Sequence, residues 1–158
     1  MTSRCLMIKF HRAAGYDTTC SHSFSGPFDQ QIKISPNPDF SSHGALTSPN
    51  EVKGLIIKLY PSTHVFGGIG QTFRNLQRLW IVDSTYQISV KFIKRSDLAN
   101  LPKLEELIIE HTAISFIPED TFWDLKGLKK LKISFSKVRT LPDNMLFGLK
   151  NLEEINFE

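Results

Sequence analysis

The stretch LEELIIEHTAISFIPEDTFWDLKG at residues 104–127 is followed at once by LKKLKISFSKVRTLPDNMLFGLKN at residues 128–151. Both copies open with apolar residues at positions one, four and six, and their later apolar positions also align. The first copy carries Leu104, Leu107, Ile109, Ile114, Ile117, Pro118, Phe122 and Leu125, and the second carries Leu128, Leu131, Ile133, Val138, Leu141, Pro142, Leu146 and Leu149. Because 128 − 104 = 24, the sequence repeats a unit of 24 residues. Such a period predicts an array of stacked repeats.

The same pattern extends to both sides of this pair. A further block opens at Leu152 with the same step of 152 − 128 = 24, and an earlier one opens at Leu76. The step from Leu76 is 104 − 76 = 28, so this copy carries 28 − 24 = 4 extra residues in its Thr85–Ser96 stretch. We therefore predict four full repeats and the first strand of a fifth within residues 52–158. The predicted starts are Val52, Leu76, Leu104, Leu128 and Leu152.

Each block of alternating apolar residues predicts a short strand that turns one row of side chains inward, followed by an irregular or helical return. No single copy buries its apolar row, and stacking the copies does. We therefore expect an α/β solenoid with short parallel strands on its concave face and irregular or helical returns on its convex face.

The sequence stops inside a repeat at Glu158. Since an uncapped strand edge is open to pairing, we expect the natural protein to continue.

Residues 1–51 lack this spacing and are rich in Ser, Pro, Gly and Phe, which indicates an N-terminal cap. The alternating run Cys5–Phe10 and a turn at Arg12–Tyr16 predict a β-hairpin whose second strand ends at Cys20. This hairpin would set the chain's two cysteines roughly opposite each other. Two cysteines so close in sequence are ambiguous on their own. The Pro-rich stretch Pro36–Asn50 is expected to be a loop that joins the cap to the repeats.

Composition argues against several classes of function. Lys and Arg number 19 against 16 Asp and Glu, and this formal charge of +3 is too small for a typical nucleic-acid-binding surface. No apolar run approaches the roughly 20 residues that span a bilayer, and Met1–Lys9 does not have the pattern of a secretory signal. We expect no nucleic-acid partner and no membrane contact within this segment.

The sequence also lacks the patterns of a catalytic or metal site. The five histidines include no pair at the i, i+4 spacing of a helical zinc site, and no further cysteines supply ligands. No GxSxG motif is present. The run Gly67–Gly70 lacks the Lys and Ser or Thr of a phosphate-binding loop, and it is expected to bend the first repeat. We therefore predict no catalytic residues, no cofactor and no metal.

Residues 52–158 resemble the typical leucine-rich repeats of extracellular proteins, as found in Toll-like receptors, slit-like adhesion proteins and secreted arthropod immune factors. The LPxxxF-like tails, Ile117 to Phe122 and Leu141 to Leu146, are characteristic of that subclass. The resemblance implies a non-catalytic scaffold from a secreted or cell-surface recognition protein, with a protein ligand or co-receptor as its partner. Two alternatives are a structural or self-associating ectodomain module and an intracellular adaptor.

The segment CLMIKFHRAAGYDTTC is similar to the disulfide-closed N-terminal caps of such extracellular proteins. The resemblance implies a disulfide between Cys5 and Cys20, and a bridge closing about 15 residues would stabilise the fold by roughly 3 kcal/mol. One departure concerns the position where the family usually places Asn, whose amide bonds the backbone of neighbouring turns. Here it holds Tyr60, Ser84, Thr112 and Ser136. Ser and Thr donate one such bond, so we expect a weaker ladder.

The outward residues of the strands are the candidate binding surface, because repeat proteins generally bind through this face. The middle outward column is predicted to be Ile56, Trp80, Ile108, Lys132 and Asn156. Its first three members would form an apolar patch, unless the cap or the long loop covers Ile56 and Trp80. Trp80 is the favoured contact because Trp is enriched in binding hot spots. The candidate partner-binding residues are Ile56, Arg78, Trp80, Val82, Glu106, Ile108, Glu110, Lys130 and Lys132.

Two further features have a structural and a functional interpretation. Charges of opposite sign are expected to pair along neighbouring strands, chiefly as a structural ladder. They are Glu105, Glu106 and Glu110, then Lys129, Lys130 and Lys132, then Glu153, Glu154 and Glu158. The insertion Thr85–Arg95 is basic and aromatic, and insertions in solenoids often map to a ligand-binding face. The structural interpretation is that Ile88, Phe92 and Ile93 pack inward.

Overall fold

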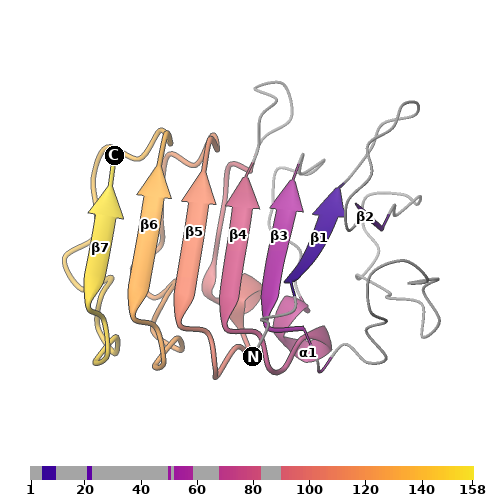
Figure 1. The fold of residues 1–158 in the computed structure, drawn as a ribbon. Helices are drawn as coiled ribbons and strands as arrows, with labels where there is room; N and C mark the ends of the chain where they lie inside the picture. Colours follow the sequence, from indigo (N-terminus) through magenta and orange to yellow (C-terminus); the bar gives the residue numbers. More distant parts are fainter. Residues whose placement is uncertain (1–4, 10–20, 23–49, 51, 59–67, 83–89) are drawn as a thin grey trace.

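The computed structural model describes residues 5–9, 21–22, 50, 52–58, 68–82 and 90–158. The described strands form one parallel seven-stranded sheet with the order β2-β1-β3-β4-β5-β6-β7, so from β3 onward each strand lies beside the next one along the chain (Figure 1). The strands are β1 Cys5–Lys9, β2 Ser21–His22, β3 Gly54–Lys58, β4 Arg78–Val82, β5 Glu106–Glu110, β6 Lys130–Ser134 and β7 Glu154–Phe157. Two short helical turns accompany them, α1 Ile69–Thr72 and the 3-10 turn η2 Arg95–Leu98. The predicted parallel-strand solenoid is confirmed, with little helix in its returns.

The pairing register is the same between all repeat strands. Leu55, Leu79, Leu107, Leu131 and Ile155 lie side by side in consecutive strands. The first four are buried, whereas Ile155 is 42% exposed. This difference arises because β7 is the last strand of the described sheet, so Ile155 is covered by a neighbouring repeat on one side only. The inward register predicted from the 24-residue period is therefore confirmed.

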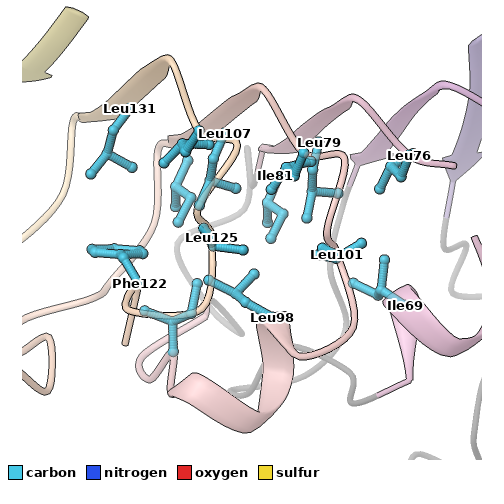
Figure 2. Packing of buried hydrophobic residues seen from close by; sticks show 14 of the residues in the cluster. Ile69, Leu76, Leu79, Ile81, Leu98, Leu101, Leu107, Phe122, Leu125 and Leu131 are labelled. Carbon is cyan, nitrogen blue, oxygen red and sulfur yellow. The ribbon is translucent and has the colours of Figure 1, made fainter. Parts of the chain in front are cut away.

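The core lies between the strands and their returns. Figure 2 shows Leu79, Leu107 and Leu131 beneath the strands, facing Leu98, Leu101, Leu125 and Phe122 of the returns. All seven side chains are at most 3% exposed. Full burial of an aliphatic or aromatic side chain contributes about 1.5 to 3 kcal/mol, so this continuous row dominates the stability of the stack.

The returns after β5 and β6 repeat the same backbone turns. The amide of Thr121 donates to the carbonyl of Pro118, and the amide of Met145 donates to that of Pro142, at 3.1 and 3.2 Å. Proline suits the start of such a turn because its ring presets φ near the helical value. The aligned prolines of the two copies therefore begin equivalent turns, which explains why they recur in the repeat.

The Gly-rich run makes a bend and a close backbone contact. Gly68 adopts φ +92°, a left-handed conformation that favours glycine, directly before α1. A Cβ added to Gly70 would lie 2.2 Å from the carbonyl oxygen of Ala99 and 2.4 Å from that of Asn100. The predicted bend is therefore present, and Gly70 additionally lets α1 pack against the chain that follows η2.

The turn and the second strand of the predicted N-terminal hairpin lie outside the described residues, and the strands that are described pair in parallel. β1 pairs in parallel with β3 along its whole length, and β2 also pairs with β1 in parallel. The reason is visible in the sequence, because Leu6 and Ile8 repeat the apolar alternation of Leu55 and Ile57 and align with them. β1 thus extends the repeat sheet. Cys20 and the predicted loop at residues 36–49 lie outside the described residues, as does the predicted turn at Arg12–Tyr16.

Among the described residues, no helix is both long and apolar enough to cross a membrane.

Candidate functional site

The outward side chains of β4 to β7 form the surface that we call the strand face. Successive residues of a strand point to opposite sides of a sheet, so the residues between the buried rows point outward. The pairing register arranges them in columns. These are Arg78, Glu106, Lys130 and Glu154; then Trp80, Ile108, Lys132 and Asn156; then Val82, Glu110 and Ser134. The backbone of Ile56 on β3 is the register partner of Trp80, but the side chain of Ile56 is not among those that the structure describes.

Glu110 is the centre of a polar network on this face. The indole nitrogen of Trp80 donates to Oε2 of Glu110 at 3.2 Å, and the hydroxyl of Ser134 donates to Oε1 at 3.2 Å. Nζ of Lys132 lies 2.7 Å from Oε1 in an ion pair. β4 contributes one of these partners and β6 contributes two, so this single carboxylate of β5 links three consecutive strands.

The same contacts keep Glu110 ionised. Its side chain is only 14% exposed, and burial acts to raise its pKa. The hydrogen bond and the charge of Lys132, with the hydrogen bonds of Ser134 and Trp80, outweigh burial and hold the pKa below its ordinary value. Glu110 therefore remains an acceptor for Trp80 and Ser134 across the neutral range.

Trp80 and Ile108 form the apolar part of the strand face. They are direct register partners on β4 and β5, and both are partly buried, as is Val82. Trp80 is thus neither covered completely nor free to move, because its ring is held by the hydrogen bond to Glu110. The predicted apolar patch is present at Trp80 and Ile108, and a polar network adjoins it.

The predicted charge ladder is confirmed for the Glu and Lys residues of β5 and β6 and for Glu154, whereas Glu153 and Glu158 have no ion pair within 4.0 Å among the described residues. Nζ of Lys130 lies 3.0 Å from Glu154 on one side and 4.0 Å from Glu106 on the other. Beside the sheet, Lys129 pairs with Glu105 at 3.3 Å. Arg78 at the start of β4 is exposed and makes no ion pair with any residue that the structure describes. The ladder therefore neutralises much of β5 to β7 and leaves one guanidinium available beside Trp80.

The described part of the insertion packs against the core and the next return. Ile93 is fully buried, as the structural interpretation predicted, whereas Phe92 is 51% exposed, so that interpretation is wrong for Phe92. Ile88 lies outside the described residues. Arg95 holds Asp124 through two hydrogen bonds of 2.7 and 2.8 Å, and this contact lowers the pKa of Asp124. Arg95, at the basic end of the insertion, thus connects its own return to the following return, which carries Asp124.

The predicted ladder of Ser and Thr hydroxyls is wrong at the two positions that the structure describes. The Oγ1 atom of Thr112 is buried and has no hydrogen-bond partner among the described residues. The Oγ atom of Ser136 accepts a 3.4 Å bond from the amide of Val138 in its own turn. Backbone bonds connect the turns instead, as where the amide of Lys137 donates to the carbonyl of Ile114 at 2.8 Å. Tyr60 and Ser84 lie outside the described residues.

Sequence reasoning missed two aromatic pairs. The rings of His111 and Phe135 are stacked in parallel with their centroids 4.5 Å apart. Trp123 and Phe147 meet edge to face at 5.4 Å on the returns. Both pairs are separated by one repeat, since 135 − 111 = 24 and 147 − 123 = 24. An alignment of the aromatic positions of neighbouring copies would therefore have revealed both.

The comparison with protein families matches residues 95–158 to the family model described as Leucine rich repeat. This segment is similar to leucine-rich repeats, and its parallel-strand solenoid is consistent with that family. β3 and β4, which precede this segment, continue the same sheet in the same register. Leucine-rich repeat domains are generally protein-binding scaffolds and typically non-catalytic. No curated protein matches the chain significantly.

Proposed function

We propose that the chain is a non-catalytic scaffold that binds another protein through the strand face, with Trp80 and Ile108 as its apolar contacts. One observation carries the proposal. The Trp80 indole is held in place by Glu110 on the neighbouring strand, so an aromatic ring is fixed on a surface that remains partly open. Fixing a side chain before binding reduces the entropy lost on association. Arg78, Glu106 and Lys130 form the neighbouring column on one side of this centre, and their charges can select a partner.

Peptides selected from a random library on the full chain provide a probe for this surface. Trp80→Ala removes the ring and is expected to weaken the selected peptides by about 1 kcal/mol or more, which is about fivefold. Trp80→Phe retains an aromatic ring but loses the donor to Glu110, so it should lose less. Isothermal titration measures both variants. Unchanged affinity for every selected peptide in Trp80→Ala would remove Trp80 from the site.

Self-association through the same surface is the main alternative. The strand face of one copy would then be covered by another copy. Light scattering of the full chain across a wide concentration range separates the two functions. A monomer at high concentration supports a different protein as the partner, whereas a dimer that Trp80→Ala dissociates supports self-association.

We further propose that the chain belongs to a secreted or cell-surface recognition protein of the innate immune or adhesion type. The support is the resemblance of its repeats to extracellular leucine-rich repeats and the presence of Cys5 and Cys20 ahead of them. Disulfides persist in oxidising compartments and are rare in the cytosol. Intact-mass measurement with and without thiol alkylation tests this on the natural protein. Free thiols at both cysteines would favour the intracellular adaptor instead.

A further inference from the structure

A tight turn of the same form stands before each of the strands β4 to β7, at the edge where the strands begin, which is the lower edge of the sheet in Figure 1. In each turn the amide of a leucine donates to the carbonyl of the residue three positions earlier, at 2.9 to 3.3 Å. These leucines are Leu76, Leu104, Leu128 and Leu152. Because neighbouring strands lie about 4.8 Å apart, the four turns form a row with roughly that spacing.

Each of the four turns carries one cation at its two central positions. Arg74, Lys126 and Lys150 occupy the first position of their turns, whereas Lys103 occupies the second position, after Pro102. We call the four cations the basic row. All four are exposed, and none has an ion pair within 4.0 Å among the described residues. Arg74, Lys103 and Lys126 lie inside the stack, with a repeat on either side, and remain exposed there.

Side-chain hydrogen bonds connect neighbouring turns of this row. Nδ2 of Asn75 donates to the carbonyl of Asn50 at 2.9 Å, and Nδ2 of Asn151 donates to the carbonyl of Lys126 at 2.8 Å. Nζ of Lys103 donates to Oδ1 of Asn75 at 2.8 Å, so this ammonium group is held toward the preceding turn. The spacing of the cations is therefore set by the stacked backbone before a partner binds, which lowers the entropy cost of binding.

The carboxylates that adjoin these turns leave the basic row positively charged. Among the described residues, Glu105 pairs with Lys129 at 3.3 Å and Asp124 pairs with Arg95 at 2.7 Å, so both are compensated by cations outside the row. Glu153 follows the last turn and has no ion pair within 4.0 Å among the described residues. Four cations against this one carboxylate leave a surplus of 4 − 1 = 3 positive charges.

The other residues of these turns indicate which kind of anion suits the row. Besides the cations, the central positions hold Asn75, Pro102, Gly127 and Asn151, so they carry no aromatic ring. The centre of a protein interface is usually aromatic or apolar and depleted in lysine. Single-stranded nucleic acid is held by aromatic side chains on which its bases stack. A row of evenly spaced cations without such groups favours a hydrophilic chain that carries anionic groups at regular intervals.

We propose that the basic row binds a sulfated polysaccharide. The sulfate and carboxylate groups of the polysaccharide lie along the row and pair with its arginine and lysines, which releases the counterions of the polyanion. The row lies at the edge of the sheet, and none of the contacts proposed for the strand face belongs to it. The inference therefore goes beyond the proposed function and does not depend on it.

The test measures the affinity of the full chain for heparin, a sulfated polysaccharide, by isothermal titration at several salt concentrations. With four ionic contacts, the affinity should fall on the order of 100-fold between about 50 and about 200 mM salt. Lys103→Gln combined with Lys126→Gln removes two of the four cations and keeps polar side chains at both positions. This double variant should bind heparin roughly fivefold to tenfold more weakly and should about halve the slope of log affinity against log salt concentration.

Lys91→Gln combined with Lys137→Gln is the matched control, because it removes the same charge from two exposed lysines that have no ion pair among the described residues and lie outside the row. It should leave the affinity and the slope nearly unchanged. Melting temperatures of both double variants show whether a loss of affinity reflects unfolding.

Three results would overturn the proposal. The first is an unmodified chain that does not bind heparin at physiological ionic strength. The second is an equal loss in the two double variants, because heparin would then respond only to the overall charge. The third is a DNA duplex or a polyglutamate peptide that binds as tightly as heparin and depends equally on Lys103 and Lys126, because the row would then belong to another class of polyanion.

Discussion

The indole nitrogen of Trp80 lies 3.2 Å from Oε2 of Glu110, a residue 30 positions further along the chain and on the neighbouring strand. Trp80 is therefore part of a contact between two repeats and is not a freely rotating surface side chain. The carboxylate that holds it is in turn paired with Lys132 on the next strand. The geometry of the strand face thus depends on the stacking of consecutive repeats, which links the stability of the fold to the proposed binding surface.

Leu131 and Ile155 occupy the same register position on adjacent strands but differ in burial, so they form a matched pair for stability. Leu131→Ala should lower the free energy of unfolding by about 2 to 5 kcal/mol, because it leaves a cavity inside the stack. Ile155→Ala should lower it by less, since Ile155 is already 42% exposed. Denaturant unfolding of the two variants measures the difference. Equal losses would show that the open side of β7 is covered in solution.

Gly70 should not tolerate a side chain. Gly70→Ala places a Cβ 2.2 Å from the carbonyl oxygen of Ala99, a separation far below van der Waals contact, so α1 or the segment after η2 must move. We expect a loss of about 1 to 3 kcal/mol, the usual range for overpacking. Gly127→Ala is the control, because its nearest contact would be 3.2 Å from the carbonyl oxygen of Pro102. A Gly70→Ala variant as stable as the Gly127→Ala variant would contradict this packing.

The Glu110 network should make stability depend on pH. The pKa of Glu110 is lowered in the folded protein, so its ionised form stabilises the fold above the ordinary carboxyl pKa, 4.5 for this group. This contribution is lost as the pH falls through the lowered value. Glu110→Gln should therefore reduce the melting temperature most at neutral pH, and the difference from the unmodified protein should shrink in acid. A difference that stays constant with pH would mean that the charge of Glu110 is not involved. Glu105→Gln, at an exposed pair, should change little throughout.

The period of the repeat was sufficient to predict most of the fold. Residues such as Leu107 and Leu131 recur at a fixed step, and only a stack of parallel strands buries both. The direction of β1 was not predictable in the same way, because it pairs with β3 across a long intervening segment and local turn signals near Gly15 favoured a hairpin. The close contact of Gly70 was also hidden, since it depends on where Ala99 passes in space.

The candidate site could be predicted as a set of columns but not as a network. Alternation along the strands places Trp80 beside Ile108 and Glu110 beside Val82, and these neighbours are as expected. The bond from Trp80 to Glu110 runs diagonally between columns, and only the length and orientation of the indole decide it. The left-handed conformations of His111 and Phe135 were equally hidden, because both residue types usually adopt other conformations.

The two tryptophans of the chain allow the central proposal to be tested directly. Trp80 lies on the strand face, whereas the indole of Trp123 donates to the carbonyl of Asn144 in the returns. Each indole N–H gives one signal in a nitrogen-proton NMR spectrum, and Trp80→Phe assigns them. When a selected peptide is added, we expect the Trp80 signal to shift and the Trp123 signal to remain in place. A shift confined to Trp123 would show that the returns bind the partner and would contradict the account.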